Sequence, residues 1–262
     1  MAFDVDDYMR RGGRLDWHDL DLRAAFSAAP LSEETLRCLQ YMHDIESHTV
    51  CYLRDTLVTS AHSDPSITTF LTAWNYEEHW HGEAIGEVLE AHGCPSGRER
   101  VSDVRRGLGW RNRWRPLSFM IGSAVLPDMV AVHMVWGAIN EFTTQASYGL
   151  LARKAGHPVL SELLRRIMRQ EGLHIDYYVS EGARRLARSR ATQRLVRMAL
   201  QRFWKLVGHG VRPADETNFV IRHLFGSHEG AAAAARIDRR ISRLPGLEGL
   251  DLVQHAAILA AA

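Results

Sequence analysis

The sequence has few cysteines and no long uninterrupted hydrophobic run, and each absence excludes a class of protein. Its three cysteines form no Cys-x-x-Cys pair, so no disulfide framework is expected, and they are interpreted as free thiols of a reducing cytoplasm. The most apolar stretch, 117–142, is interrupted by Pro127, Asp128 and Glu141, which argues against a membrane span. Residues 1–14 contain no apolar segment of the secretory type.

An excess of charge of either sign is also absent. The 32 Lys and Arg residues balance 31 Asp and Glu residues, giving a formal net charge of +1. The uniformly basic surface of a nucleic-acid-binding protein is therefore not expected. Hydrophobic residues make up 46% of the chain and charged residues 24%, which is typical of a globular protein. We expect a cytoplasmic protein that binds no nucleic acid.

No run of residues alternates with the period of a β-strand, so the chain is predicted to be all-α. Residues 1–30 lack sustained periodicity and are predicted to form an irregular N-terminal arm. Residues 31–190 are predicted to form a helical bundle, with 191–262 as additional C-terminal helices packed on it in the same domain. Residues 94–116, rich in glycine and proline, are predicted to be mostly loop, with room for one short helix. The expected helices cover 31–60, 65–93, 117–155 with a break at Pro127, 159–188, 189–208, 214–225 and an interrupted tail from Ala231.

Each of four long predicted helices carries a carboxylate in the stripe that should face the core. Burying an unpaired ionised carboxylate costs several kcal/mol, so four of them at one depth would not be tolerated in an apolar core. The stripes follow the three-four spacing of a bundle helix. They are Leu36, Leu39, His43, Glu46, Val50, Leu53 and Leu57; Leu71, Trp74, Glu78, His81, Ile85 and Val88; Met134, Ala138, Glu141, Gln145 and Tyr148; and Leu160, Leu164, Ile167, Glu171, His174, Tyr178 and Glu181.

Two divalent cations would neutralise these carboxylates, and two imidazoles would complete their ligands. The predicted metal ligands are Glu46, Glu78, His81, Glu141, Glu171 and His174. The pattern matches the di-iron carboxylate bundle, in which two helices give one Glu each and two give Glu-x-x-His. A single Glu-x-x-His is expected roughly once by chance, whereas two copies separated by a helix with a further core Glu are far rarer. The alternative is that these residues are solvated on helix surfaces. The sequence favours a ferritin-like four-helix bundle with a di-metal centre.

Several neighbours of these residues receive structural interpretations. His43 is interpreted as a buried histidine that supports the site or is satisfied in the core, rather than as a ligand. Glu181 is interpreted as a member of a hydrogen-bonded network. Trp74, Tyr148 and Tyr178 are expected to pack the core, with electron transfer or a radical as the alternative.

Two arginine-rich segments stand out. The first spans 98–115 and includes Trp110 and Trp114, and the second lies in 184–197. Each is either a solvated face or a docking site for an acidic partner such as an acyl carrier protein.

Two motifs give the chain a resemblance to a known family. The motifs are Ala73-Trp74-x-x-Glu77-Glu78-x-x-His81-Gly82 and Glu141-x-x-Thr144-x-x-Ser147-x-Gly149-x-x-Ala152-Arg153. Over about 35–185 the chain resembles the soluble acyl-[acyl-carrier-protein] desaturases of the ferritin-like di-iron superfamily. The resemblance implies a homodimeric oxidoreductase of fatty acid metabolism that uses two iron ions per chain, dioxygen and a ferredoxin-like electron donor to remove hydrogens from an acyl chain. It also implies that the Thr144 hydroxyl lies beside the oxygen-binding face.

The chain departs from the family at three positions. Gln170 and Leu173 stand where the family has Asp and Arg on its route for electrons, and Tyr148 stands where it commonly has His. These departures leave open a di-iron hydroxylase or N-oxygenase of a specialised metabolite, and a non-enzymatic ferritin-like iron protein is a further alternative. The ligand types suit Fe/Fe and Mn/Fe equally.

Overall fold

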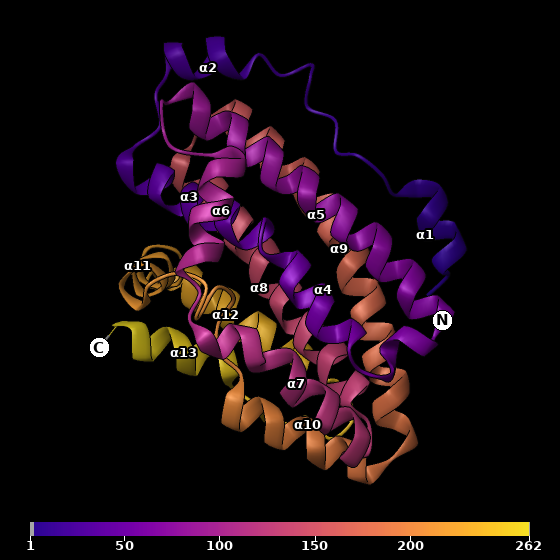
Figure 1. Ribbon diagram of the computed structural model, residues 1–262. Helices are drawn as coiled ribbons and strands as arrows, with labels where there is room; N and C mark the ends of the chain where they lie inside the picture. The colour runs from indigo at the N-terminus through magenta and orange to yellow at the C-terminus, as the bar shows by residue number, and fades with distance from the viewer. Residues whose placement is uncertain (1–2, 262) are drawn as a thin grey trace.

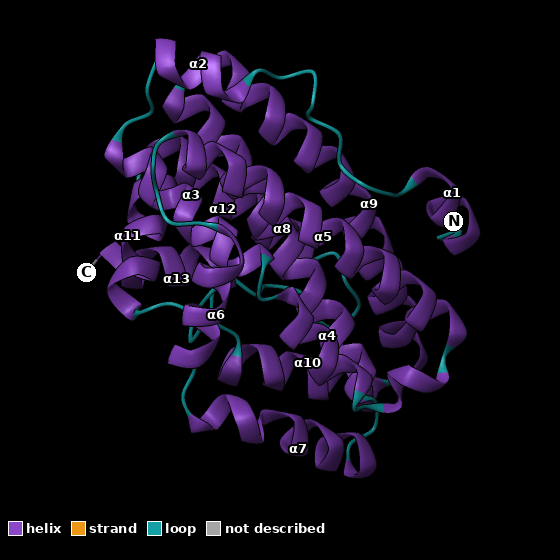
Figure 2. Cartoon of the chain, turned by 45° about the horizontal axis from the view of Figure 1, so that its top comes forward, coloured by secondary structure: helices purple, strands orange, loops and turns teal. Residues whose placement is uncertain are grey.

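Helices make up nearly all of the regular structure in the computed structural model, which describes residues 3–261 except the side chains of Arg111 and Ala261 (Figure 2). Within that range there is no β-strand, so the all-α prediction is confirmed. The elements are α1 (Val5–Arg11), α2 (Leu22–Ala28), α3 (Glu33–Glu46), α4 (Thr49–Leu57), the short 3-10 helix η1 (Ser60–Ser63), α5 (Pro65–Ala91), α6 (Gly97–Gly107), α7 (Trp110–Val125), α8 (Met129–Ala155), α9 (Pro158–Arg188), α10 (Arg190–Phe203), α11 (Ala214–Phe225), α12 (His228–Ile241) and α13 (Leu252–Ala261).

Four helices, α3, α5, α8 and α9, form the centre of the molecule (Figure 1). Helix α3 packs along α5, α8 packs along α9, and the two pairs meet where α5 contacts α9 and α3 contacts α8. Gly156 ends α8 with a φ of 61°, a conformation that suits glycine, and its N–H donates to the Ala152 carbonyl. The His157 side chain then caps α9, which begins at Pro158. This tight turn makes α8 and α9 neighbours in space.

The predicted helix 31–60 is interrupted immediately after Glu46. The Ser32 side chain caps α3 as expected, and the helix ends at Glu46. The Thr49 hydroxyl donates to the Glu46 carbonyl at 2.7 Å, so a side chain satisfies a carbonyl oxygen left free at the helix end. Helix α4 then begins at Thr49. The stripe predicted for one helix is therefore split, and Val50 is exposed rather than buried.

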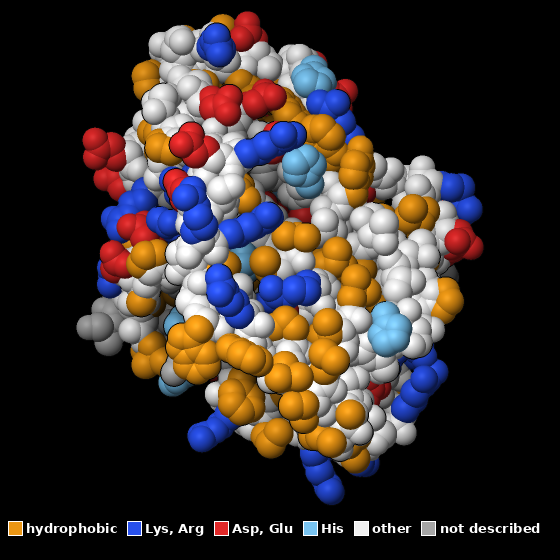
Figure 3. All heavy atoms as spheres, in the orientation of Figure 1, with side chains coloured by type: hydrophobic (Ala, Val, Ile, Leu, Met, Phe, Trp, Pro, Cys, Tyr) orange, Lys and Arg blue, Asp and Glu red, His pale blue; other side chains and the backbone are white. Residues whose placement is uncertain are grey.

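The prediction of mostly loop for 94–116 is wrong, because most of that segment is helical. Its glycines lie at helix ends, where they do not oppose helix formation: Gly97 begins α6, Gly107 ends it and Gly109 precedes α7. Helix α7 also accommodates Pro116 in its interior. Arg100 holds α6 to the body through two hydrogen bonds to the buried Asp44 carboxylate, at 2.6 and 2.8 Å. Figure 3 shows a group of hydrophobic side chains over the region of α7.

The N-terminal arm is also more ordered than its sequence predicts. It contains α1 and α2, and it buries Tyr8, Trp17 and Phe26. Each helix has only seven residues, too few to show a periodicity, and each is started by an aspartate side chain that accepts a backbone N–H. The expectation of an irregular arm is therefore corrected.

The C-terminal helices pack on the four central helices as well as on one another. Helix α10 contacts α8 and α9, α11 contacts α3 and α8, and α12 contacts α8. Two hydrogen bonds of 2.9 Å from the Arg37 guanidinium to the Glu216 carboxylate join α3 to α11. The predicted interruption of the tail at Pro245 and Gly246 is confirmed. None of the helices in the described range is both long and apolar enough to cross a membrane.

Candidate metal centre

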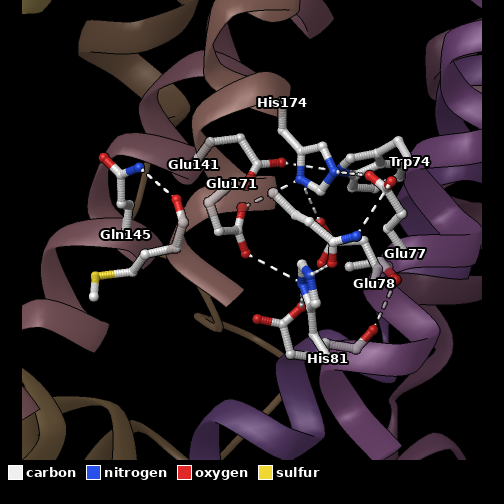
Figure 4. Close-up of polar contacts among 12 residues, drawn as sticks. Trp74, Glu77, Glu78, His81, Glu141, Gln145, Glu171 and His174 are labelled. Atoms are coloured by element: carbon white, nitrogen blue, oxygen red, sulfur yellow. Dashed lines mark hydrogen bonds and ion pairs between the residues drawn. The ribbon is translucent and has the colours of Figure 1, made fainter. Parts of the chain in front are cut away.

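All six predicted metal ligands meet in the interior, between α3, α5, α8 and α9 (Figure 4). Their exposed fractions are 6% or less. Helix α3 supplies Glu46, α5 supplies Glu78 and His81, α8 supplies Glu141, and α9 supplies Glu171 and His174. The three-residue spacing on α5 and α9 puts each Glu and His on one helical face, because residues three apart are neighbours on a helix surface. The interpretation of these residues as solvated helix surface is therefore wrong.

The six residues form two overlapping groups, each of which could hold a metal ion. The first group is Glu46, Glu78, His81 and Glu171, and the second is Glu78, Glu141, Glu171 and His174. Within each group, one potential ligand atom per residue lies within 4.8 Å of the others. Glu78 and Glu171 belong to both groups, as expected of carboxylates that bridge two ions. The donor set of carboxylate oxygen and imidazole nitrogen suits first-row transition metals such as iron and manganese.

Both histidines direct the same ring nitrogen into the cluster. The Nδ1 atom of His174 lies 3.2 Å from Glu171 Oε2 and 3.2 Å from Glu78 Oε1. The Nδ1 atom of His81 lies 3.4 Å from Glu171 Oε1. Each Nε2 atom points out of the cluster and contacts a side-chain oxygen. In metal-binding histidines, such a contact fixes the orientation of the ring and leaves the other ring nitrogen free to bind an ion.

The outer contacts of the two histidines come from Glu77 and Gln170. The His174 Nε2 atom lies 2.7 Å from Glu77 Oε2, and the His81 Nε2 atom lies 2.9 Å from Gln170 Oε1. Figure 4 shows Glu77 directed at the outer edge of the His174 ring. A carboxylate paired with a histidine ring raises the basicity of that ring toward a metal. In the sequence, Glu77 stands out only as part of a motif, and its position beside Glu78 is the one signal of this role.

The N-terminal arm contacts both Glu77 and Gln170, the residues on the outer side of the two histidines. The Tyr8 hydroxyl donates to Glu77 Oε2 at 2.7 Å, and the Gly13 N–H donates to Glu77 Oε1 at 2.7 Å. The Gln170 amide donates to the Gly13 carbonyl at 2.8 Å. The arm therefore holds the two residues that orient the histidines. The sequence of the arm, which lacks sustained periodicity, does not predict this connection to the bundle.

Several buried atoms of the cluster make no hydrogen bond although charged neighbours lie close. They are Glu78 Oε1, His81 Nδ1 and Glu171 Oε1. Buried polar atoms without a hydrogen bond are rare in proteins, and each carries a free-energy cost of about 1–3 kcal/mol. All three belong to the predicted ligand set and point toward the other ligands. The carboxylate oxygens and the imidazole nitrogen present here therefore fit the ligand set of a bound cation.

The electrostatics of the cluster also favour a cation. Burial and the neighbouring Glu46 and Glu171 carboxylates raise the pKa of Glu78 well above its usual value. Burial, followed by Glu171, has the same effect on the pKa of Glu141. Burial alone would lower the pKa of His174, but the carboxylates of Glu171, Glu77 and Glu78, each within 3.2 Å of a ring nitrogen, raise it well above its usual value. Protons therefore offset the excess negative charge, and metal ions compete with protons for the same atoms.

Two aromatic side chains contact ligands directly. The Tyr148 hydroxyl donates to Glu46 Oε1, and the Trp74 Nε1–H donates to Glu141 Oε1 at 2.9 Å. Both side chains are buried as expected of core residues, but each also fixes a carboxylate. Tyr178 is fully buried and packs against the Phe70 and Trp74 rings.

His43 and Glu181 lie outside both ligand groups, as expected. His43 Nδ1 is 3.4 Å from Asp44 Oδ1, and its side chain is buried. Glu181 accepts hydrogen bonds from Arg184 and Arg185. Part of the second arginine-rich segment is therefore engaged in ion pairs within the chain.

A small, mainly apolar cavity lies beside the cluster. Glu46, Thr144 and Tyr148 line it, and Thr144 is half-buried. The remaining lining residues are mainly apolar and come from α3, α8, α11 and the segment after α10: Tyr41, Met42, Ile45, Thr143, Ser147, Leu206, Val207, Val220, Ile221 and Phe225. The C-terminal helices thus help to form the space next to the candidate metal centre, a contribution that their sequence did not predict.

Comparison with protein-family models and with curated proteins finds no match to this sequence. The desaturase resemblance therefore depends on the two quoted motifs, while the ligand groups and the cavity are features of the chain itself.

Proposed function

We propose that the chain is an oxygen-dependent di-iron oxidase with a ferritin-like bundle, acting on an apolar acyl-type group. The observation that carries this proposal is the pair of overlapping ligand groups that share Glu78 and Glu171. Two iron ions held there would supply the stepwise electron transfer to dioxygen that amino-acid side chains do not provide. A neighbouring apolar cavity supports an apolar substrate.

In this proposal the residues around the ligands orient them. Glu77 and Gln170 fix the rings of His174 and His81, and Trp74 fixes the Glu141 carboxylate. A centre whose ligands are already oriented loses less conformational entropy when it binds metal and substrate. The Glu77–His174 and Trp74–Glu141 contacts are buried and the Gln170–His81 contact is partly buried, so water competes little for them.

The cavity gives the proposed substrate its place. An acyl chain would lie against the apolar side chains of α11 and of 206–207, with its reacting carbon near Glu46 and Thr144. The Thr144 hydroxyl is proposed to pass a proton to the reacting oxygen, consistent with its place in the cavity wall. An acyl carrier protein is the proposed form of delivery, and a ferredoxin-like protein the proposed electron donor.

A second function, hydroxylation or N-oxygenation of a specialised metabolite, is favoured by one contact. Gln170, which contacts His81, carries a neutral amide where the desaturase pattern has a carboxylate. An amide does not raise the basicity of the imidazole as a carboxylate does, so the iron beside His81 would have different redox properties. The products distinguish the two functions: desaturation removes two hydrogens from the substrate, and hydroxylation adds one oxygen atom.

The first test is anaerobic reconstitution with Fe(II), followed by iron analysis and Mössbauer spectra before and after exposure to oxygen. Two coupled irons per chain that are oxidised by dioxygen are expected. One iron or none would overturn the proposal. Mass spectrometry of reactions with acyl-carrier substrates and a reductant then tests the substrate class. A stable multi-subunit shell of ferritin size in solution would instead support the iron-storage alternative.

A further inference from the structure

Helix α7 exposes an apolar stripe to solvent. The stripe, here called the α7 outer face, consists of Trp114, Leu117, Met120, Ile121 and Val125, whose exposed fractions range from 45% to 72%. The positions follow the three-four spacing that normally marks the buried side of a helix. Figure 3 shows hydrophobic side chains gathered over this helix. Contiguous apolar patches of this kind mark interaction surfaces.

The opposite side of α7 is attached to the body by specific contacts. The Arg115 guanidinium pairs with the Asp55 carboxylate, which is almost fully buried. The Phe119 ring lies 4.7 Å from the His133 ring, centroid to centroid. The Ser60 N–H donates to Ser123 Oγ at 3.0 Å. Rotating α7 to bury its apolar stripe would break all three contacts, so the orientation of the outer face is fixed by the fold.

Every charged residue in the segment that carries the stripe is positive, and two of these residues, Arg106 and Arg115, pair with Asp103 and Asp55. Residues 104–127 contain no Asp or Glu. They contain five arginines: Arg105, Arg106, Arg111, Arg113 and Arg115. Arg113 is exposed and precedes Trp114 directly. Such a surface complements an anionic partner, whereas two copies of it facing each other would repel.

We propose that α7 is a membrane-surface anchor that binds the headgroup region of an anionic lipid bilayer. The combination of an apolar stripe, a tryptophan near one end and flanking arginines is that of a helix lying in the plane of the interface. Leu117, Met120 and Ile121 enter the acyl boundary, while the exposed Arg113 contacts lipid phosphates. A protein–protein partner would need to combine an apolar groove with a negative rim, whereas an anionic bilayer offers both along its whole surface.

The test is flotation of the full chain with vesicles of phosphatidylcholine alone and of phosphatidylcholine with phosphatidylglycerol. The wild-type chain is expected to float with the anionic vesicles and to bind neutral vesicles at least about tenfold more weakly. The double variant Met120→Ser, Ile121→Ser is expected to lose at least about tenfold in affinity for anionic vesicles. Arg113→Glu is expected to reduce the preference for anionic lipid.

The matched control is Ile258→Ser, Leu259→Ser, which removes two exposed apolar side chains from α13. It should bind vesicles as the wild type does, and circular dichroism should show all variants equally helical. No flotation of the wild type, or equal loss in both double variants, would overturn the proposal. A chain that is dimeric in solution, and that becomes monomeric only in the α7 variant, would assign the face to a second copy instead. Loss of binding to an acidic carrier protein, with vesicle binding unchanged in the α7 variant, would also contradict it.

Discussion

The candidate metal centre and the α7 outer face depart from the usual distribution of side chains in opposite ways. Between α3, α5, α8 and α9 the protein buries the four carboxylates and two histidines of the ligand groups, and on α7 it exposes the five large apolar side chains of the outer face. The two departures differ in free-energy cost. An unpaired buried charge costs several kcal/mol, whereas an apolar side chain exposed in both the folded and the unfolded states changes stability little. The interior departure is therefore the stronger evidence for a missing binding partner.

The largest expected effect comes from removing a carboxylate shared by both ligand groups. Glu171→Ala should reduce iron from two ions per chain to none after reconstitution, because both ions lose a ligand. His174→Ala, which affects one group, should retain about one. Glu181→Ala, ten residues further along α9, is the control and should bind two irons. Equal iron content in all four proteins, measured by elemental analysis, would show that these residues do not hold the metal.

The second-largest effect, on metal affinity, is expected at Glu77, which contacts the predicted ligand His174 on the side away from the cluster. Glu77→Gln removes the charge that faces His174 Nε2 while keeping the side-chain size. Metal affinity should fall by about 10–100-fold, as is usual when the partner of a metal-binding histidine is changed. A competition titration with a chelator measures this change. Glu87→Gln, on the same helix but bonded to Trp17, should leave the affinity unchanged.

A smaller effect, on stability, is expected from adding a methyl group to the tightly packed interior around the candidate metal centre. A Cβ atom added at Gly137 would lie 2.5 Å from the Tyr178 ring. Gly137→Ala should therefore lower the free energy of unfolding by about 1–3 kcal/mol, measured by urea denaturation. An unchanged midpoint would mean that the Tyr178 ring moves freely. Gly107→Ala, where nothing lies within 4 Å of the added atom, is the control.

The smallest effect is expected on the surface. Met120→Ser, Ile121→Ser should change the free energy of unfolding by no more than about 0.5 kcal/mol, since these side chains lose no core contacts. The same urea titration measures it. A loss above about 2 kcal/mol would show that the outer face packs against the chain itself.

The sequence predicted the six-residue cluster because its spacing depends on helix geometry alone. A carboxylate three residues before a histidine faces the same way in any regular helix, so Glu171 and His174 were identifiable without tertiary information. Features that depend on tertiary contacts were not predicted. The arm helices are too short to show periodicity, and the Asp44–Arg100 and Asp55–Arg115 pairs that hold α6 and α7 join residues far apart in the chain.

The contact between the arm and Glu77 has a practical consequence for work on this protein. Tyr8 and Gly13 hold the carboxylate that faces His174, and a side chain at Gly12 would come within 2.6 Å of Glu77 Oε1. By thermodynamic linkage, whatever loosens the arm weakens the metal site, and metal binding in turn tightens the arm. An affinity tag or a truncation at the N-terminal end would thus modify the candidate metal centre, and protease resistance of residues 3–13 would become a readout of metal occupancy.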